Sequence, residues 1–206
     1  WLQSNGVDRP EALLNGLTNV TGKPYLRIAS LPEPKSPKVL EDKLQSCFQK
    51  LADDWSAQRD SVEKILLEDD RLNRNRYRAS SVAVWITQMD QLLKCSRPDF
   101  MVLREFTRFD RFQASVISER RSVKKGHVPP THPFFESCDD FAERLKNLEA
   151  TYQQCYRIFQ RELYQYVVIE LPLRKAERGA LGFDDLLTRL QAALRSPYSG
   201  SLVEKL

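Results

Sequence analysis

The sequence has 206 residues, of which 32 are Lys or Arg and 28 are Asp or Glu, so its formal net charge is +4. This length is enough for one ordinary domain with a hydrophobic core. No apolar run approaches the roughly eighteen residues of a membrane-spanning helix. The N-terminus, WLQSN, has neither an initiator methionine nor a signal-peptide pattern. We therefore expect a cytoplasmic, water-soluble chain that is a fragment of a longer protein.

The first elements in chain order are a short helix and a stiff connector. A helix is expected over residues 10–19, with Asp8 as its cap and a proline in its first turn. Residues 31–37 contain three prolines, which are incompatible with a helix and favour an extended path. Glycines are few and strand-like alternation is nearly absent, so the pattern predicts an all-α fold.

Two long apolar stripes with heptad-like spacing dominate the rest of the chain and predict a helical bundle. They run over residues 44–65 and 141–166, where apolar side chains recur at intervals of mostly three or four positions. Core packing explains such stripes most simply, so the two long helices are expected to pack on each other. Shorter helices are expected over 80–95 and 101–115, and Pro172 is expected to end or kink the second long helix.

Positive charge gathers in the middle of the chain. Residues 71–128 carry thirteen Lys and Arg against five Asp and Glu, and two clusters stand out, RLNRNRYR at 71–78 and ERRSVKK at 119–125. Guanidinium groups beside amides and an aromatic ring suit a phosphate backbone. We interpret the clusters as a contact with duplex DNA made by eight residues: Arg71, Arg74, Arg76, Arg78, Arg120, Arg121, Lys124 and Lys125. The alternative is a solvated surface that only keeps the chain soluble.

Catalytic motifs are missing from the sequence. It has no G-x-x-x-x-G-K-[ST] loop to cradle a triphosphate, and no G-x-G-x-x-G or G-x-S-x-G turn. His127 and His132 lie in a proline-bound loop without metal-ligand spacing. The scattered cysteines are expected to be reduced thiols: Cys47, Cys95, Cys138 and Cys155. We therefore expect no catalytic residue, no metal and no cofactor in this chain itself.

The stretch RGALGFDDLLTRLQAALRS, residues 178–196, predicts an amphipathic helix near the end of the chain. Gly182 can end the preceding segment. Asp184 is expected to be the N-cap, and Asp185 adds a second carboxylate to the first turn, where the helix dipole favours negative charge. Leucines at helical spacing give the helix one apolar face that needs a partner.

This stretch resembles the G-x-L-x-F-D-D-L-L element of superfamily 1 DNA helicases of the UvrD and Rep type. In that family the element lies where the chain leaves the helical subdomain 1B and returns to the ATPase core 1A. The resemblance implies that residues 1–178 are a 1B-type arm and that residues 179–206 begin the return into 1A. It also implies that Phe183 anchors this segment on the core and that the following residues support it: Asp184, Asp185, Leu186 and Leu187.

Three further stretches resemble the RecB branch of this family, the beta subunits of exodeoxyribonuclease V. They are RPEALLNGLTNVTGKPY, AVWITQMDQLL and THPFFESCDDF. The resemblance implies a parent helicase and nuclease that uses ATP and Mg, works with RecC-type and RecD-type subunits, and acts in double-strand break repair and recombination. It implies an arm that reaches duplex DNA near a fork or end and packs on the RecC-type subunit. The alternative is a helical scaffold that binds a partner and has no DNA affinity of its own.

Overall fold

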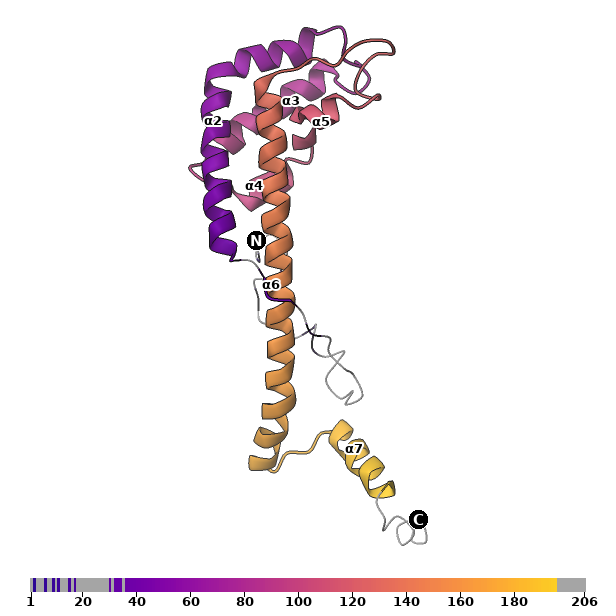
Figure 1. Cartoon of the computed structure of the whole chain (residues 1–206). Helices are drawn as coiled ribbons and strands as arrows, with labels where there is room; N and C mark the ends of the chain where they lie inside the picture. The colour runs from indigo at the N-terminus through magenta and orange to yellow at the C-terminus, as the bar shows by residue number, and fades with distance from the viewer. Residues whose placement is uncertain are drawn as a thin grey trace. The chain divides into compact units, whose positions relative to one another are not determined.

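The structure, a computed structural model, describes residues 36–195 and, before them, only positions 2, 6, 9, 11, 15, 17, 30 and 32–34. Helices form its architecture (Figure 1), and within these residues the only β-type pairing is one isolated bridge. The predicted all-α fold is confirmed. The short helix expected over 10–19 falls largely outside the described residues. Of the connector over 31–37, residues 32–34 and 36 have no helical structure, as expected, whereas Pro37 is already the first residue of α2. None of the described helices is both long enough and apolar enough to cross a membrane.

The chain divides into two compact units, one formed by residues 1–6 and 33–154 and the other by residues 7–32 and 155–206. The described helices, with η2 a 3₁₀-helix, have these bounds: α2 Pro37–Glu68, α3 Ala79–Leu93, α4 Phe100–Glu105, η2 Phe109–Phe112, α5 Ala114–Ile117, α6 Pro133–Glu177 and α7 Phe183–Leu194.

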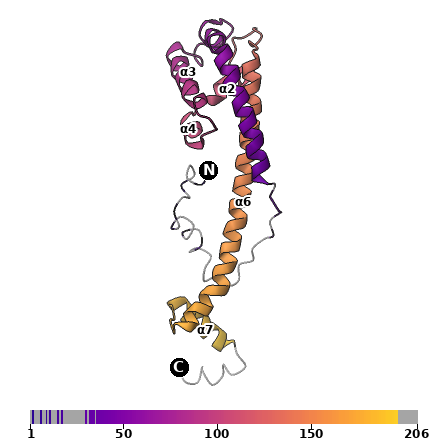
Figure 2. The ribbon, with the colours of Figure 1, turned by 90° about the vertical axis from the view of Figure 1, so that its left-hand side faces the viewer.

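The first unit is built on α2 and the N-terminal part of α6, which lie side by side in both ribbon views (Figures 1 and 2). Large aromatic side chains fill the space between them. The ring centroids of Phe48 and Phe141 are 5.8 Å apart, and those of Trp55 and Phe134 are 5.0 Å apart. All four side chains are buried. The prediction that the two long helices pack on each other is therefore confirmed for this part of α6.

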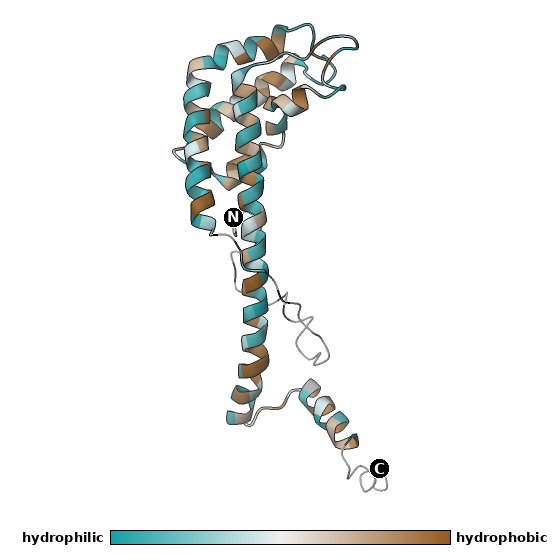
Figure 3. Ribbon diagram, viewed as in Figure 1, coloured by the Kyte–Doolittle hydropathy of each residue, from teal (hydrophilic) through white to brown (hydrophobic). Residues whose placement is uncertain are grey.

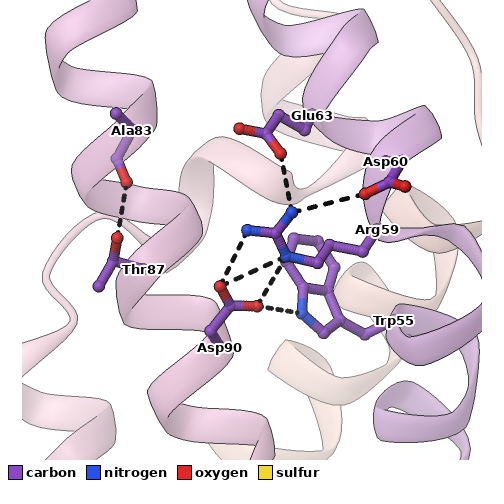
Figure 4. Close-up of polar contacts among 7 residues, drawn as sticks. All are labelled: Trp55, Arg59, Asp60, Glu63, Ala83, Thr87 and Asp90. Atoms are coloured by element: carbon purple, nitrogen blue, oxygen red, sulfur yellow. Dashed lines mark hydrogen bonds and ion pairs between the residues drawn. The ribbon is translucent and has the colours of Figure 1, made fainter.

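Helix α3 packs against α2 and adds a polar contact at the edge of the core (Figure 4). Its carboxylate Asp90 accepts a hydrogen bond from Trp55 Nε1 at 2.9 Å and another from Arg59 Nε at 3.0 Å. Arg59 also pairs with Glu63, one turn further along α2, at 2.9 Å. The apolar side of α3 is buried beside this contact: Val82, Trp85, Ile86, Met89 and Leu92.

The single helix predicted over residues 101–115 is wrong, because the chain forms three short helices there. The reason lies in three phenylalanines spaced three residues apart. The ring of Phe106 lies 5.8 Å from that of Phe109 and 6.0 Å from that of Phe112. Side chains three residues apart align in a 3₁₀ turn but not in a regular α-helix. The chain therefore tightens at η2, which lets this aromatic cluster join the core.

Helix α6 continues beyond the buried part of its predicted stripe. Its last buried residue is Thr151, whereas Phe159 is 46% exposed and Tyr166 is 52% exposed. Figure 3 shows hydrophobic residues recurring along this later part of α6. The expectation of core packing is thus wrong for these residues within the described part of the chain. Pro172 does not end the helix, which runs to Glu177. This turn is exposed, so water can bind the carbonyl that loses its amide partner.

Candidate nucleic-acid interface

The two basic clusters predicted from the sequence, 71–78 and 119–125, adjoin each other in the structure. An isolated antiparallel bridge pairs Leu72 of the first with Val123 of the second. Both side chains are buried, and Leu72 belongs to the hydrophobic core, so apolar contact as well as hydrogen bonds holds the bridge in place. The clusters therefore form one surface, although they are far apart in the sequence.

Three hydrogen bonds hold the two turns in register. The backbone amide of Asn73 donates to the carbonyl of Ser122 at 2.9 Å, and that of Lys124 donates to the carbonyl of Arg71 at 2.8 Å. The Asn73 side chain adds a bond from Nδ2 to the carbonyl of Arg121 at 3.0 Å. A buried polar group is costly unless it is paired, and these bonds satisfy the backbone of both turns where they meet.

Two of the eight predicted residues, Arg71 and Arg74, hydrogen-bond with groups at the C-terminal end of α2. Arg71 forms an ion pair with the Asp69 carboxylate, with Nη2 and Oδ2 2.6 Å apart. The hydrogen bond from Arg71 lowers the pKa of Asp69. Arg74 donates to the carbonyl of Leu66, in the last turn of α2, and to that of Asp69, which also accepts from the amide of Leu72. A cation is also favourable at the negative end of a helix. Arg71 and Arg74 thus stabilise the turn.

Two more of the eight share one carboxylate. Arg76 Nη2 lies 3.0 Å from Glu119, and Arg121 also hydrogen-bonds to Glu119. The Arg76 side chain is only 11% exposed, while that of Arg121 is 72% exposed. Hydrogen bonding from Arg121, ahead of the other contributions, lowers the pKa of Glu119, so this carboxylate stays charged at neutral pH. It fixes both guanidinium groups at the edge of the surface.

The remaining four predicted residues are exposed cations without a partner. None of them forms a side-chain hydrogen bond or ion pair with any residue that the structure describes. A fifth residue of this kind, which the sequence interpretation missed, lies between α4 and η2. The five are Arg78, Arg108, Arg120, Lys124 and Lys125. Arg108 lay within the basic region 71–128, but no cluster marked it. These five side chains are available to an external anion.

A hollow of about 530 Å³ opens beside the bridge. Five of the side chains that line it are arginines from three separate segments: Arg76, Arg78, Arg108, Arg111 and Arg121. Among the described residues two carboxylates pair with them, Glu119 and Asp110, the latter 3.8 Å from Arg111 Nε. The hollow is therefore strongly positive, and its concave shape concentrates this field.

The C-terminal helix α7 is capped differently from the prediction. Gly182, in an extended conformation, is the N-cap, so Asp184 is the second residue of the helix and the prediction that it is the N-cap is wrong. Asp185, the third residue, accepts hydrogen bonds from the amide of Gly182 and from Lys175 Nζ, both at 2.7 Å. Asp185 therefore caps the helix, since a carboxylate at the third position reaches back to the N-cap amide.

The other residues expected to dock on a helicase core lie on an exposed face of α7. Phe183 is 74% exposed, and Leu186 and Leu187 are each about half exposed. The side chain of Asp184 lies outside the part of the chain that the structure describes. Docking of these residues on a helicase core therefore stays a prediction, and the exposure of Phe183, Leu186 and Leu187 is compatible with it.

The described cysteines and histidines can be examined for a metal site and for thiol reactivity. Within the described residues no three His, Cys, Asp or Glu side chains gather as a metal site requires. Burial, followed by a hydrogen bond to Asp140, raises the pKa of Cys47 to about 11, and burial raises that of Cys138 still more clearly. Both are protonated thiols at neutral pH and poor nucleophiles.

Comparison with known proteins gives one distant similarity. No protein-family model matches the sequence. The chain is 26% identical over 191 residues to the RecBCD enzyme subunit RecB of Escherichia coli (strain K12). The match covers 91% of this chain but only 15% of that protein. The chain is therefore similar to a limited stretch of a much longer protein.

Proposed function

We propose that this chain is the helical arm of a RecB-like helicase and nuclease subunit, and that it holds duplex DNA near a fork or end. The distant similarity to RecB along most of the chain supports the first part. The bridge between Leu72 and Val123 is the observation that carries the second, because it joins two basic turns into one surface. Residues 1–178 are then the arm, and residues 179–206 begin the return to an ATPase core.

In this proposal the five exposed cations contact DNA phosphates. Since they have no partner among the described residues, binding DNA breaks no ion pair within the protein. Phosphate contacts position a protein on the duplex without reading its sequence. Arg71 and Arg74 act indirectly by holding the first turn. The motor chemistry, with ATP and Mg, and the RecC-type and RecD-type partners belong to the parent protein.

The test is a DNA titration by fluorescence anisotropy at several salt concentrations, with blunt, forked and single-stranded probes. About five phosphate contacts predict that log affinity falls with log salt at a slope of about −4 to −5 on duplex DNA. Replacing Arg78, Arg120, Lys124 and Lys125 with Gln is expected to bring the slope close to −1, because each lost phosphate contact removes about one unit.

A matched control removes four exposed lysines of α2 and α6 instead: Lys38, Lys43, Lys64 and Lys146. It changes the net charge equally, and we expect it to keep most of the slope. An equal loss in both quadruple variants would show that net charge, and no defined surface, attracts the DNA.

A second candidate function is partner binding without DNA affinity. The exposed apolar residues of α7 favour it, because contiguous apolar surface often marks a protein interface. In the helicase resemblance this partner is the ATPase core of the same chain. Absence of wild-type DNA binding even at low salt would favour this candidate over the first.

A further inference from the structure

We propose that the arginine-lined hollow holds one phosphate group of the DNA backbone at a fixed position. This inference rests on the proposed DNA binding and specifies its central contact. It separates two kinds of cation on the surface. The outer cations, Arg120, Lys124 and Lys125, act diffusely, whereas the hollow supplies directed hydrogen bonds to a single phosphate.

Two free guanidinium groups reach the hollow from different segments. Arg78 immediately precedes α3, and Arg108 lies between α4 and η2. Both are exposed and neither has a partner among the described residues. Arginine presents planar N–H pairs that match phosphate oxygens, often two at a time. A phosphate in the hollow can therefore accept hydrogen bonds from both sides.

Two further guanidinium groups lie deeper in the wall. The side chains of Arg76 and Arg111 are only 11% and 13% exposed. The Nε of each is buried and has no hydrogen-bond acceptor among the described residues. A buried cation is costly unless it is compensated, and within the described part of the chain each pairs with one carboxylate, Arg76 with Glu119 and Arg111 with Asp110. An anion in the hollow would add the missing compensation.

Helix α3 adds to this field. Arg78, Ser81 and Trp85 line the hollow from successive turns at the beginning of the helix. No side chain caps the first turn, and the amides of Ser81 and Val82 donate to the carbonyl of Arg78, so the helix contributes through its dipole. The positive end of a helix favours a phosphate. This contribution comes in addition to the arginines, which form the site.

The shape of the wall favours a phosphate over a nucleobase. Stacking would require an open aromatic face, but Trp85 is only 8% exposed and its ring is packed against that of Tyr77 at 5.9 Å. The volume of about 530 Å³ exceeds that of one phosphate group. It thus leaves room for the sugars on either side of a backbone phosphate.

The test uses forked DNA in which one phosphate at a time is replaced by a neutral methylphosphonate. The fork fixes the register of binding. If the hollow holds one phosphate, a single position should cost about tenfold or more in affinity, and the neighbouring positions much less. Arg78→Gln with Arg108→Gln should abolish this position dependence. The matched control, Arg120→Gln with Lys124→Gln, removes two exposed cations outside the hollow and should preserve it.

The outcomes separate the two proposals. Small and equal losses of affinity at every methylphosphonate position would overturn the phosphate site but leave the proposed DNA binding intact. An equal loss of position dependence in both double variants would have the same consequence. No wild-type binding would overturn both proposals. A titration with inorganic phosphate at constant ionic strength, followed by intrinsic tryptophan fluorescence, adds a third measurement. Suppose that the wild type responds to inorganic phosphate, that Arg78→Gln with Arg108→Gln removes this response, and that DNA binding shows no position dependence. This result would assign the hollow to a free anion and overturn the contact with the DNA backbone.

Discussion

At the scale of single residues, Asp90 shows how a polar contact can fasten two helices. Burial acts to raise the pKa of Asp90, but hydrogen bonds from Arg59 and Trp55 outweigh it, and the pKa is lowered. The carboxylate is therefore ionised throughout the neutral range. Nothing in the sequence marks Asp90 as special, because its donors come from another helix and only the packing of α2 against α3 brings them together.

We expect Asp90→Asn to lower the free energy of unfolding at pH 7 by about 1–3 kcal/mol, because charged hydrogen bonds are lost. The folded pKa lies below the unfolded value of about 4, so this contribution is complete above that value and disappears as pH falls through the folded pKa. The difference between wild type and Asp90→Asn, measured by urea unfolding, should be constant above about pH 5 and shrink below pH 4.

Asp60→Asn is the matched control. Asp60 contacts the same guanidinium at 3.5 Å, but its side chain is 99% exposed, so the expected change is below about 0.5 kcal/mol. A difference for Asp90→Asn that stays constant down to pH 2 would show that the charge of Asp90 is not what stabilises the fold.

At the scale of elements, periodicity was a good guide where one side of a helix meets the core. It predicted α2, α3 and the helical course of α6, because burial of large side chains such as Phe48 and Phe141 repeats with the helical period. Periodicity gave a wrong prediction in two places, the segment 101–115 and the part of α6 that follows Thr151. The spacing of Phe106, Phe109 and Phe112 shortens the chain into a 3₁₀ turn, and the stripe of α6 outlasts its buried contacts. Apolar spacing alone does not say where a helix leaves the core.

The same substitution at two places in α6 measures that boundary. Phe141→Ala should lower the free energy of unfolding by about 3–5 kcal/mol, because it leaves a cavity beside Phe48 and Phe109. Phe159→Ala, on the exposed part of the same helix, should cost less than about 1 kcal/mol. Chemical unfolding followed by circular dichroism gives both values. Similar costs at the two positions would mean that Phe159 is covered in solution.

At the scale of the whole molecule, the sequence indicated which parts are basic but not that they meet. The clusters at 71–78 and 119–125 could be predicted from charge alone. Their joining depends on the path of α3, α4, η2 and α5, which no local pattern specifies. The hollow followed even less from the sequence, since Arg108 and Arg111 lie among aromatic residues outside both clusters.

All residues that form the basic surface and the hollow lie in the first of the two units. We therefore expect a chain of residues 33–154 to fold alone and to keep the DNA affinity and salt slope of the full chain. The cut follows Thr151, the last buried residue of α6. Circular dichroism and the same anisotropy titration provide the measurement. A cooperatively folded 33–154 chain without DNA affinity would place essential contacts in the second unit.

The basic surface is assembled only while the bridge between Leu72 and Val123 is closed. The amide hydrogens of Asn73 and Lys124 exchange with solvent only when this pairing opens, and opening separates the two turns. Their exchange rates therefore give the fraction of molecules in which the surface is assembled. During synthesis that fraction is zero until the segment around residue 124 can fold back. During synthesis about fifty more residues must therefore be added after the first basic turn before the complete surface can form.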